Sequence, residues 1–373
     1  MNSARTTVRQ APGKLFIAGE YAVVEPGYPA VVVGVDRQVS VAVSGSSSDD
    51  VTLASDLILD DVRLRRQGGG LAGCTPDDER RARRELAYVV SAIDVMDELL
   101  GARGVSALPI RVSISSGLHE AGTKLGLGSS GAVTVATIAA VADHHGLALS
   151  DSDWFRLALL ATARIDTGPS GADLAAGIWG GWLAYYAPDR VAVLDLARRR
   201  GIEEALRAPW PGFGLRRLPP PETLALEVGW TGEPASTTSL VSALKTQRGW
   251  ADHQAYKGFL ADTAECVRAL MRALVLGEDR ELLRQIRCAR NLLARLDRQL
   301  GLGIFTPRLT ALCDAAESVG GAGKPSGAGG GDCGIALVKA DALPNIARLR
   351  EKWTSANVWP VPMRVPLVAR EPR

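Results

Sequence analysis

Cysteine, aromatic side chains and long apolar runs are all scarce in this chain of 373 residues. The 5 cysteines are odd in number, scattered and without a C-x-x-C pair, so neither a disulfide framework nor a zinc site is indicated. No apolar stretch approaches the roughly 18 residues that a membrane span needs, and residues 1–7 lack the apolar core of a signal peptide. We therefore expect a cytoplasmic protein with no membrane partner.

An excess of one charge is also absent. The sequence holds 43 Lys and Arg residues against 41 Asp and Glu residues, a formal net charge of +2. Basic runs such as 198–200 lie beside acidic residues and are typical of a solvated face. Because nucleic-acid binders concentrate positive charge, we expect no nucleic-acid partner.

The chain is rich in glycine, with 40 residues, and has a hydrophobic content of 46%. That content is ample for the cores of two or three domains.

The most informative segment is a glycine- and serine-rich loop that follows Lys124 and runs directly into the apolar segment 133–142. Glycines let the backbone approach an anion without Cβ clashes, and serines supply hydroxyl groups. The start of the expected helix adds unpaired N–H groups and the positive end of the helix dipole. The loop therefore suits the phosphates of a nucleoside triphosphate. Its residues are Gly126, Leu127, Gly128, Ser129, Ser130, Gly131 and Ala132.

Three known motifs have residues in common with this loop, but the sequence features that each of them requires elsewhere are absent here. The dinucleotide pattern G-x-G-x-x-G requires a buried strand just before it, whereas the segment 119–124 is polar. The protein-kinase loop G-x-G-x-x-G-x-V requires H-R-D and D-F-G downstream, and neither occurs. The Walker pattern is missing, because Pro325 follows Lys324. For the loop taken alone, a plain Gly/Ser turn into a core helix remains the alternative.

Three other segments could complete a phosphate site. Lys14 follows a Pro-Gly turn and can meet a phosphate as a point charge. Asp173 lies in or near the first turn of an expected helix, where a carboxylate can accept a proton or steady a metal–phosphate complex. The small-residue loop 324–334 could hold a second anion. Each has an ordinary explanation by itself, but their joint presence with Lys124 argues against a purely structural role.

In order and spacing, these clusters resemble the three motifs of the galactokinase, homoserine kinase, mevalonate kinase and phosphomevalonate kinase (GHMP) superfamily. The segments 19–24, 229–237 and 324–336 look most like those of the bacterial phosphomevalonate kinases. The resemblance implies an α+β fold with an active site in the cleft between two domains. The N-terminal domain would be of the ribosomal-protein-S5-domain-2-like type, and the C-terminal domain would be a ferredoxin-like α/β sandwich.

Proline is concentrated in the segment 209–221, which is the best candidate for a domain boundary. It separates residues 1–208, which carry the ATP phosphate loop, from residues 222–373, which carry the later glycine-rich loop. Apolar periodicity predicts helices over 83–100, 132–144, 256–275 and 280–300, and strands over 31–43, 110–115, 224–228 and 335–338.

The resemblance also implies roles for particular residues. ATP would place its phosphates on the loop 126–132, with the Ser130 hydroxyl nearest to Mg²⁺. Lys14, Lys124 and Asp173 would be the catalytic residues. The implied reaction is ATP-dependent phosphorylation of phosphomevalonate to mevalonate diphosphate, on the pathway to isoprenoid precursors. The acceptor would contact Lys14, Glu20, Tyr21, Ser170, Gly171, Ser326, Gly327, Ala328 and Gly329.

A phosphate acceptor changes what the site has to do. The second pKa of a phosphomonoester is about 6, so the nucleophile is already an anion near neutral pH. Catalysis should then depend on neutralising and aligning two anions, with Asp173 orienting Lys14 or the metal. If the acceptor were an alcohol, as in mevalonate kinase, Asp173 would be the natural proton acceptor.

Two departures from the family pattern leave alternatives open. The segment 169–173 reads Pro-Ser-Gly-Ala-Asp, which is closer to the mevalonate kinase form, so mevalonate kinase or another GHMP small-molecule kinase is the alternative. Thr162 stands where mevalonate kinases carry a glutamate, with Arg164 and Asp166 nearby, and the metal carboxylate stays unassigned. Diphosphomevalonate decarboxylase shares the architecture, but Lys14, Lys124 and the segment 229–232 look more like a phosphomevalonate kinase.

A hypothesis of another class is a catalytically silent sensor that binds ATP and a metabolite. Such a protein should lack a catalytic charge, whereas the three expected catalytic residues are all present. We therefore expect an enzyme whose partners are small-molecule substrates, and which is a monomer or a homodimer.

Overall fold

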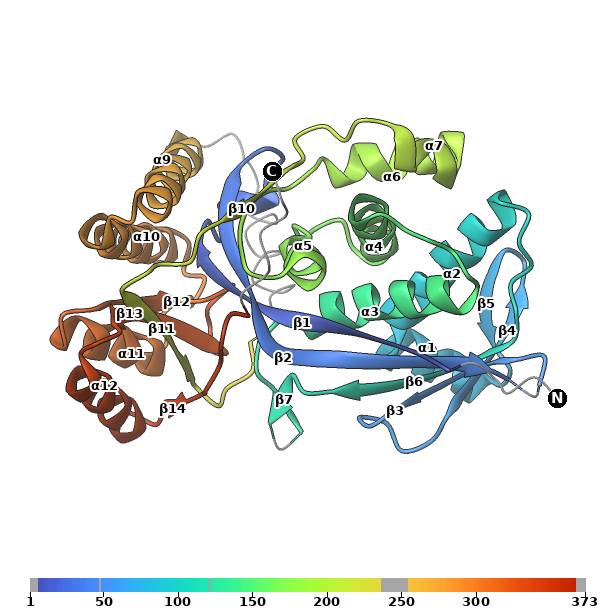
Figure 1. Cartoon of the computed structure of the whole chain (residues 1–373), viewed down its shortest axis with the longest axis horizontal. Helices are drawn as coiled ribbons and strands as arrows, with labels where there is room; N and C mark the ends of the chain where they lie inside the picture. The colour runs from blue at the N-terminus through green and yellow to red at the C-terminus, as the bar shows by residue number, and fades with distance from the viewer. Residues whose placement is uncertain (1–5, 47, 121, 236–253, 367–373) are drawn as a thin grey trace.

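The protein is described by a computed structural model that covers residues 6–46, 48–120, 122–235 and 254–366. Two sheets organise these residues, a larger one at the N-terminal side and a smaller one at the C-terminal side (Figure 1). No described helix has both the length and the apolar character needed to span a bilayer.

The larger sheet has eight strands. Seven follow the order β10-β9-β2-β6-β3-β4-β5, and β1 pairs antiparallel with β2. The strands are β1 (Thr7–Ala18), β2 (Pro29–Gly45), β3 (Val51–Ser55), β4 (Val62–Gln67), β5 (Gly70–Gly73), β6 (Ile110–Ser116), β9 (Trp182–Tyr186) and β10 (Gly214–Leu218). A separate short hairpin joins β7 (His119–Glu120) to β8 (Thr123–Lys124).

Helices cover one face of this sheet (Figure 1). α3 (Ser129–His144) packs on β1 and β2, and it is buried on nearly every side because α2 and α4 enclose it. Small Ala, Val and Thr side chains allow this close packing. The other elements of this half are η1 (Ala22–Val24), α1 (Pro76–Glu85), α2 (Ala87–Ala102), α4 (Asp151–Ile165), α5 (Ala172–Trp179), α6 (Arg190–Arg200) and α7 (Ile202–Arg207).

The smaller sheet has the order β12-β13-β11-β14 and is antiparallel throughout. Its own core is centred on Trp353, whose indole N–H donates to the Leu312 carbonyl at 3.0 Å. The elements are β11 (Leu224–Trp230), α9 (Gln254–Leu276), α10 (Asp279–Leu300), α11 (Pro307–Ser318), β12 (Ala322–Pro325), β13 (Cys333–Lys339), α12 (Leu343–Ser355) and β14 (Trp359–Pro360).

The four helices and four strands that apolar periodicity predicted are present, with one error. The helix expected over 83–100 is interrupted at Leu86, whose φ of −123° and ψ of 14° are not helical. The chain instead forms a separate helix α1, because Thr75 begins it with a capping box closed by Asp78. The proline-rich segment contains β10, which pairs with β9 and adds residues 214–218 to the larger sheet. The division into residues 1–208 and 222–373 remains our proposal for the domains.

Asp94 on α2 offers a test of stability against pH. Its carboxylate accepts a hydrogen bond from the Leu71 N–H at 2.9 Å, and burial raises the pKa of Asp94 to about 6 despite that bond. An unfolded Asp has a pKa of about 4, so the folded state binds this proton more tightly, and stability is lost as the pH rises from about 4 through about 6.

Asp94→Asn keeps an acceptor for the Leu71 N–H and removes the ionisation. We therefore expect the variant to melt at a higher temperature than the parent protein at pH 8, with a much smaller difference near pH 4. Thermal unfolding of both proteins at the two pH values measures this. A shift of equal size at both values would show that the charge of Asp94 is not the cause.

Candidate active site

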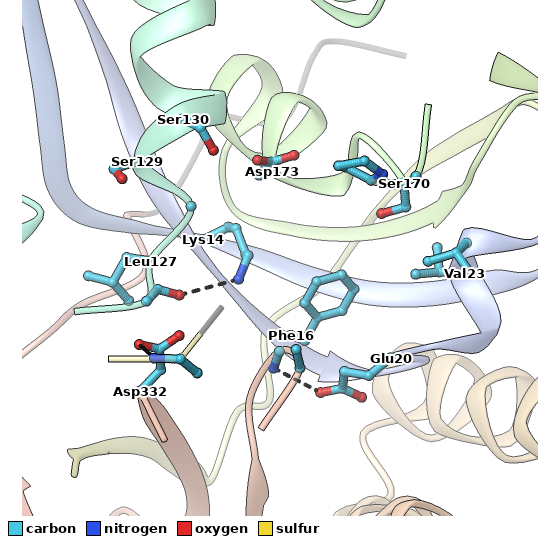
Figure 2. Close-up of a pocket in the computed structure, with 18 of the residues that line it drawn as sticks. Lys14, Phe16, Glu20, Val23, Leu127, Ser129, Ser130, Ser170, Asp173 and Asp332 are labelled. Carbon is cyan, nitrogen blue, oxygen red and sulfur yellow. Dashed lines mark hydrogen bonds between the residues drawn. The ribbon is translucent and has the colours of Figure 1, made fainter. Parts of the chain in front are cut away.

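A cavity of about 470 Å³ lies where the two sheets approach each other. Its wall is built from the end of β1, η1, the glycine loop before α3, the turn before α5 and the glycine-rich loop between β12 and β13 (Figure 2). The lining residues are Lys14, Phe16, Glu20, Tyr21, Val23, Val24, Tyr88, Lys124, Gly126, Leu127, Gly128, Ser129, Ser130, Asp166, Gly168, Pro169, Ser170, Asp173, Ala235, Gly327, Ala328 and Asp332.

The loop before α3 has the geometry of an anion site. Gly126 and Gly128 have φ values of 75° and 77°, which an L side chain rarely adopts. Gly128 is the N-cap of α3, and no side chain there accepts a bond from the first helical N–H groups. The Gly131 N–H faces the Asp173 carboxylate, and the N–H groups of Ser129 and Ser130, with the positive end of the helix, are available to a phosphate. A hairpin of β7 and β8, not a buried parallel strand, precedes the loop, in agreement with the exclusion of a dinucleotide fold.

Lys14 lies at the centre of the cavity. Its backbone N–H donates to the Leu127 carbonyl at 2.8 Å, and its Nζ approaches the Gly126 carbonyl oxygen at 3.4 Å. The ammonium also lies 5.2 Å from the centroid of the Phe16 ring. Figure 2 shows the side chain between Asp173 on one side and Asp332 on the other. Lys14 is thus a cation that lies near two carboxylates and contacts the glycine loop.

Asp173 begins α5 and faces the start of α3. A Cβ on Gly128 would lie 3.0 Å from the Asp173 Cβ, and one on Gly131 would lie 2.9 Å from it, so only glycines leave room for this carboxylate. Burial raises the pKa of Asp173, while Lys14 and the backbone N–H groups of Leu174 and Gly131 oppose that rise. The two helix starts therefore converge on one half-buried acid.

Asp332 is a cavity residue that the sequence reasoning did not select. Its φ of 52° is in the left-handed region, its carboxylate accepts the Ala235 N–H at 3.0 Å, and it packs directly on Gly126. Burial raises the pKa of Asp332, and the Ala235 N–H, Lys14 and Lys124 lower it. In the sequence, the indication of this role is a single acidic residue within a run of glycines. Residues other than glycine rarely adopt the left-handed conformation, so an Asp at such a position indicates a specific local contact.

The wall on the side of α5 is held by hydrogen bonds from side chains to backbone carbonyls. The Tyr185 hydroxyl donates to the Ser170 carbonyl at 2.6 Å. The buried guanidinium of Arg190 donates to the carbonyls of Thr167 at 3.0 Å and Val24 at 2.6 Å. These bonds keep the turn before α5 beside η1. Tyr88 and Asp166 also face the cavity, and neither was predicted as a site residue.

Most of the predicted site residues line this one cavity, but some do not. Gly131 and Ala132 lie behind the loop inside α3, and Gly171 packs on Leu159 and the Tyr185 hydroxyl. Gly329 packs on Ile304. Predicted residues on the wall are Lys14, Glu20, Tyr21, Lys124, Gly126, Leu127, Gly128, Ser129, Ser130, Ser170, Asp173, Gly327 and Ala328.

Ser326 has a structural partner instead of a place on the wall. Its hydroxyl accepts the Phe16 N–H at 2.9 Å and donates to the Phe16 carbonyl at 3.1 Å. The side chain is buried and joins β1 to the end of β12. An acceptor contact through the Ser326 hydroxyl therefore lacks support in this geometry.

The donors around Ser130 fit a magnesium ion that is held mainly by phosphate and water. The described residues contain no group of three His, Cys, Asp or Glu that could hold a metal alone. Mg²⁺ keeps several waters and usually takes one or two carboxylates together with substrate phosphates. Ser130 and Asp173 lie next to each other at the start of α3 (Figure 2), and they supply a hydroxyl and a carboxylate of that kind.

Comparison with known proteins gives consistent matches along the chain. The model of the GHMP kinases N terminal domain matches residues 87–181, and that of the GHMP kinases C terminal matches residues 270–354. A phosphomevalonate kinase of Streptomyces sp. (strain CL190) is 59% identical over 365 residues, which are 96% of this chain and 97% of that protein.

Two solved structures have the same fold over nearly the same length. The Streptococcus pneumoniae phosphomevalonate kinase in complex with phosphomevalonate and AMPPNP aligns with a TM-score of 0.83 and 28% identity, covering 96% of this chain and 99% of that one. The Lin0012 protein from Listeria innocua aligns with a TM-score of 0.86 and 31% identity, covering 96% and 98%.

Proposed function

Because this chain belongs to the GHMP kinases and, among them, to the phosphomevalonate kinases, we propose that it transfers the γ-phosphoryl group of ATP to the phosphate of phosphomevalonate. The products are mevalonate diphosphate and ADP. The two-domain α+β fold expected from the sequence is confirmed by these matches. The observation that carries the assignment is the 59% identity to a phosphomevalonate kinase along almost the whole length of both chains.

The position of Lys14 supports a transfer between two anions. ATP phosphates on the N–H groups at the start of α3 would lie on one side of its ammonium, and the acceptor phosphate near Ser170 and Gly327 on the other. Its Nζ is 3.4 Å from the Gly126 carbonyl, and a Cβ on Gly327 would be 3.6 Å from it, so it reaches both loops. A cation there lowers the repulsion between donor and acceptor and stabilises the charge of the transferred group.

Asp173 fits an orienting role better than that of a general base. The acceptor phosphate is already ionised near neutral pH, so no proton has to be removed from it. Burial beside Lys14 instead makes Asp173 the counter-charge that holds the ammonium in place. Mg²⁺, held near Ser130 and Asp173, would neutralise charge on the ATP phosphates. Lys124 at the cavity mouth would add to the attraction of both anions.

Release of ADP with Mg²⁺-ATP tests the acceptor. The acceptors are phosphomevalonate, mevalonate, mevalonate diphosphate, homoserine and galactose, each assayed in parallel. We expect kcat/KM for phosphomevalonate to exceed that for mevalonate, homoserine and galactose by about two orders of magnitude or more, because a site built for a charged group rejects an analogue without it. Mevalonate diphosphate, the product, should not be turned over. Preferred turnover of mevalonate would instead favour the alternative raised by residues 169–173, and no turnover on any acceptor would favour the sensor.

A further inference from the structure

A buried ion pair behind the acceptor side of the cavity has no part in the mechanism above. Lys324 on β12 has no exposed surface, and its Nζ donates to a carboxylate oxygen of Glu20 and to the Pro325 carbonyl. Glu20, just after β1, is 3% exposed. The two residues are 304 positions apart, so the pair joins the segment just after β1 to β12. Burying two charges is costly, and an apolar pair would serve stability as well or better.

The same carboxylate also holds the loop. Oε1 of Glu20 accepts the Gly327 N–H at 3.4 Å, as drawn in Figure 2. The next residue, Ala328, accepts a hydrogen bond from the Tyr21 hydroxyl through its carbonyl. Gly327 has a φ of 93° and lines the cavity next to Lys14. The position of the loop therefore depends on the segment that directly follows β1, and Glu20 is one of its anchors.

The charge of Glu20 is in an unfavourable place for an enzyme of this kind. Glu20 contributes to the wall of a cavity that has to admit two highly charged anions, ATP and a phosphate-bearing acid. Apolar side chains of α9 and α10, among them Phe259 and Leu293, lie on its other side and provide no compensation. A carboxylate in such surroundings would repel the acceptor strongly, because the local dielectric constant is low.

We propose that Lys324 is a positioning residue for the acceptor. Its ammonium cancels the charge of Glu20 and holds the Glu20 carboxylate where it accepts the Gly327 N–H. The loop can then face an anion without a competing negative charge behind it. In this proposal Glu20 acts through the loop, and the sequence-based expectation that it also contacts the acceptor stays a prediction, because Glu20 lines the cavity. This inference rests on the proposed function.

The test separates the charge from the packing. With Lys324→Met, which leaves Glu20 uncompensated, we expect the KM for phosphomevalonate to rise at least about tenfold and the KM for ATP to change less than about threefold. With Glu20→Gln, whose side-chain oxygen can still accept the Gly327 N–H, the KM for phosphomevalonate should stay the same or fall. The double variant Glu20→Gln, Lys324→Met should recover most of the acceptor affinity that Lys324→Met loses.

A purely structural pair would behave differently. It would lower the melting temperature and raise both KM values in the two single variants alike, and that result would overturn the proposal. If Lys324→Met does not fold, the double variant carries the test, because it buries neither an unpaired carboxylate nor an unpaired ammonium; a raised acceptor KM in the double variant would also overturn the proposal. Lys339→Met, at an exposed position on β13, controls for the substitution itself. Absence of turnover in the unmodified protein would contradict the proposed function, whereas turnover without the KM difference contradicts this inference alone.

Discussion

Replacing Lys14 with Met should lower kcat for phosphorylation of phosphomevalonate about a thousandfold, while ATP affinity changes only a few-fold. The Nζ of Lys14 lies between two carboxylates and beside both anion loops, where no neighbouring backbone group can replace its charge. Methionine has a similar length and can keep the packing on Phe16, so the loss reports on the charge. Steady-state kinetics together with direct measurement of nucleotide binding separate the two effects.

The conservative variant Lys14→Arg distinguishes the effect of the charge from that of its geometry. Arginine keeps the positive charge, but its planar guanidinium does not fit a site shaped around a point charge. We expect an intermediate kcat for it. A Lys14→Met enzyme with near-normal kcat would refute the assigned role, and an equal loss of ATP affinity and kcat would mean that Lys14 serves only to bind nucleotide.

Adding one methyl group at Gly131 should reduce kcat about a hundredfold with little loss of stability. A Cβ at this position would lie 2.9 Å from the Asp173 Cβ and still closer to its carboxylate, so a change of side-chain rotamer cannot relieve the clash. The carboxylate beside Lys14 has to move, and small displacements of this kind are costly in catalysis. Gly131→Ala also favours α3 by up to about 1 kcal/mol, which offsets part of the overpacking.

Gly258→Ala is the matched control. Gly258 is inside α9, and a Cβ there would meet nothing within 4 Å. It should gain a little stability and keep full activity. Kinetics and thermal unfolding of both variants measure the contrast. If Gly131→Ala kept its kcat, the position of Asp173 relative to α3 would not be important for transfer.

The sequence predicted the anion loops because their signals are local. Glycines at left-handed positions, a helix that starts directly after them and a strand directly after the run 327–331 are all properties of neighbouring residues. For the same reason the apolar periodicity located the long helices, and it failed where the capping box at Thr75 started a separate helix. The resemblance to a known family then indicated the reaction and the acceptor, which the residue pattern alone did not determine.

The hydrogen-bond and ion-pair partners of individual side chains could not be predicted from local sequence. Ser326 and Glu20 were predicted as substrate contacts, but the sequence did not indicate that the first is bonded to Phe16 and the second to Lys324. Asp332 was only one residue of the predicted anion loop 324–334, yet it packs on Gly126 and its carboxylate accepts the Ala235 N–H. Each of these contacts joins residues that are far apart in the chain.

By itself, therefore, the sequence determined which segments can bind phosphate and which kinase family the chain resembles, because backbone conformation and helix starts are set by local sequence. Only the tertiary structure decided which charges meet. Lys14 and Asp173 come from different parts of the larger-sheet half, while Asp332 and Lys324 come from the other half of the chain. Their pairing depends on how the two sheets pack, and a buried charge acquires its role from the partner that the fold places beside it.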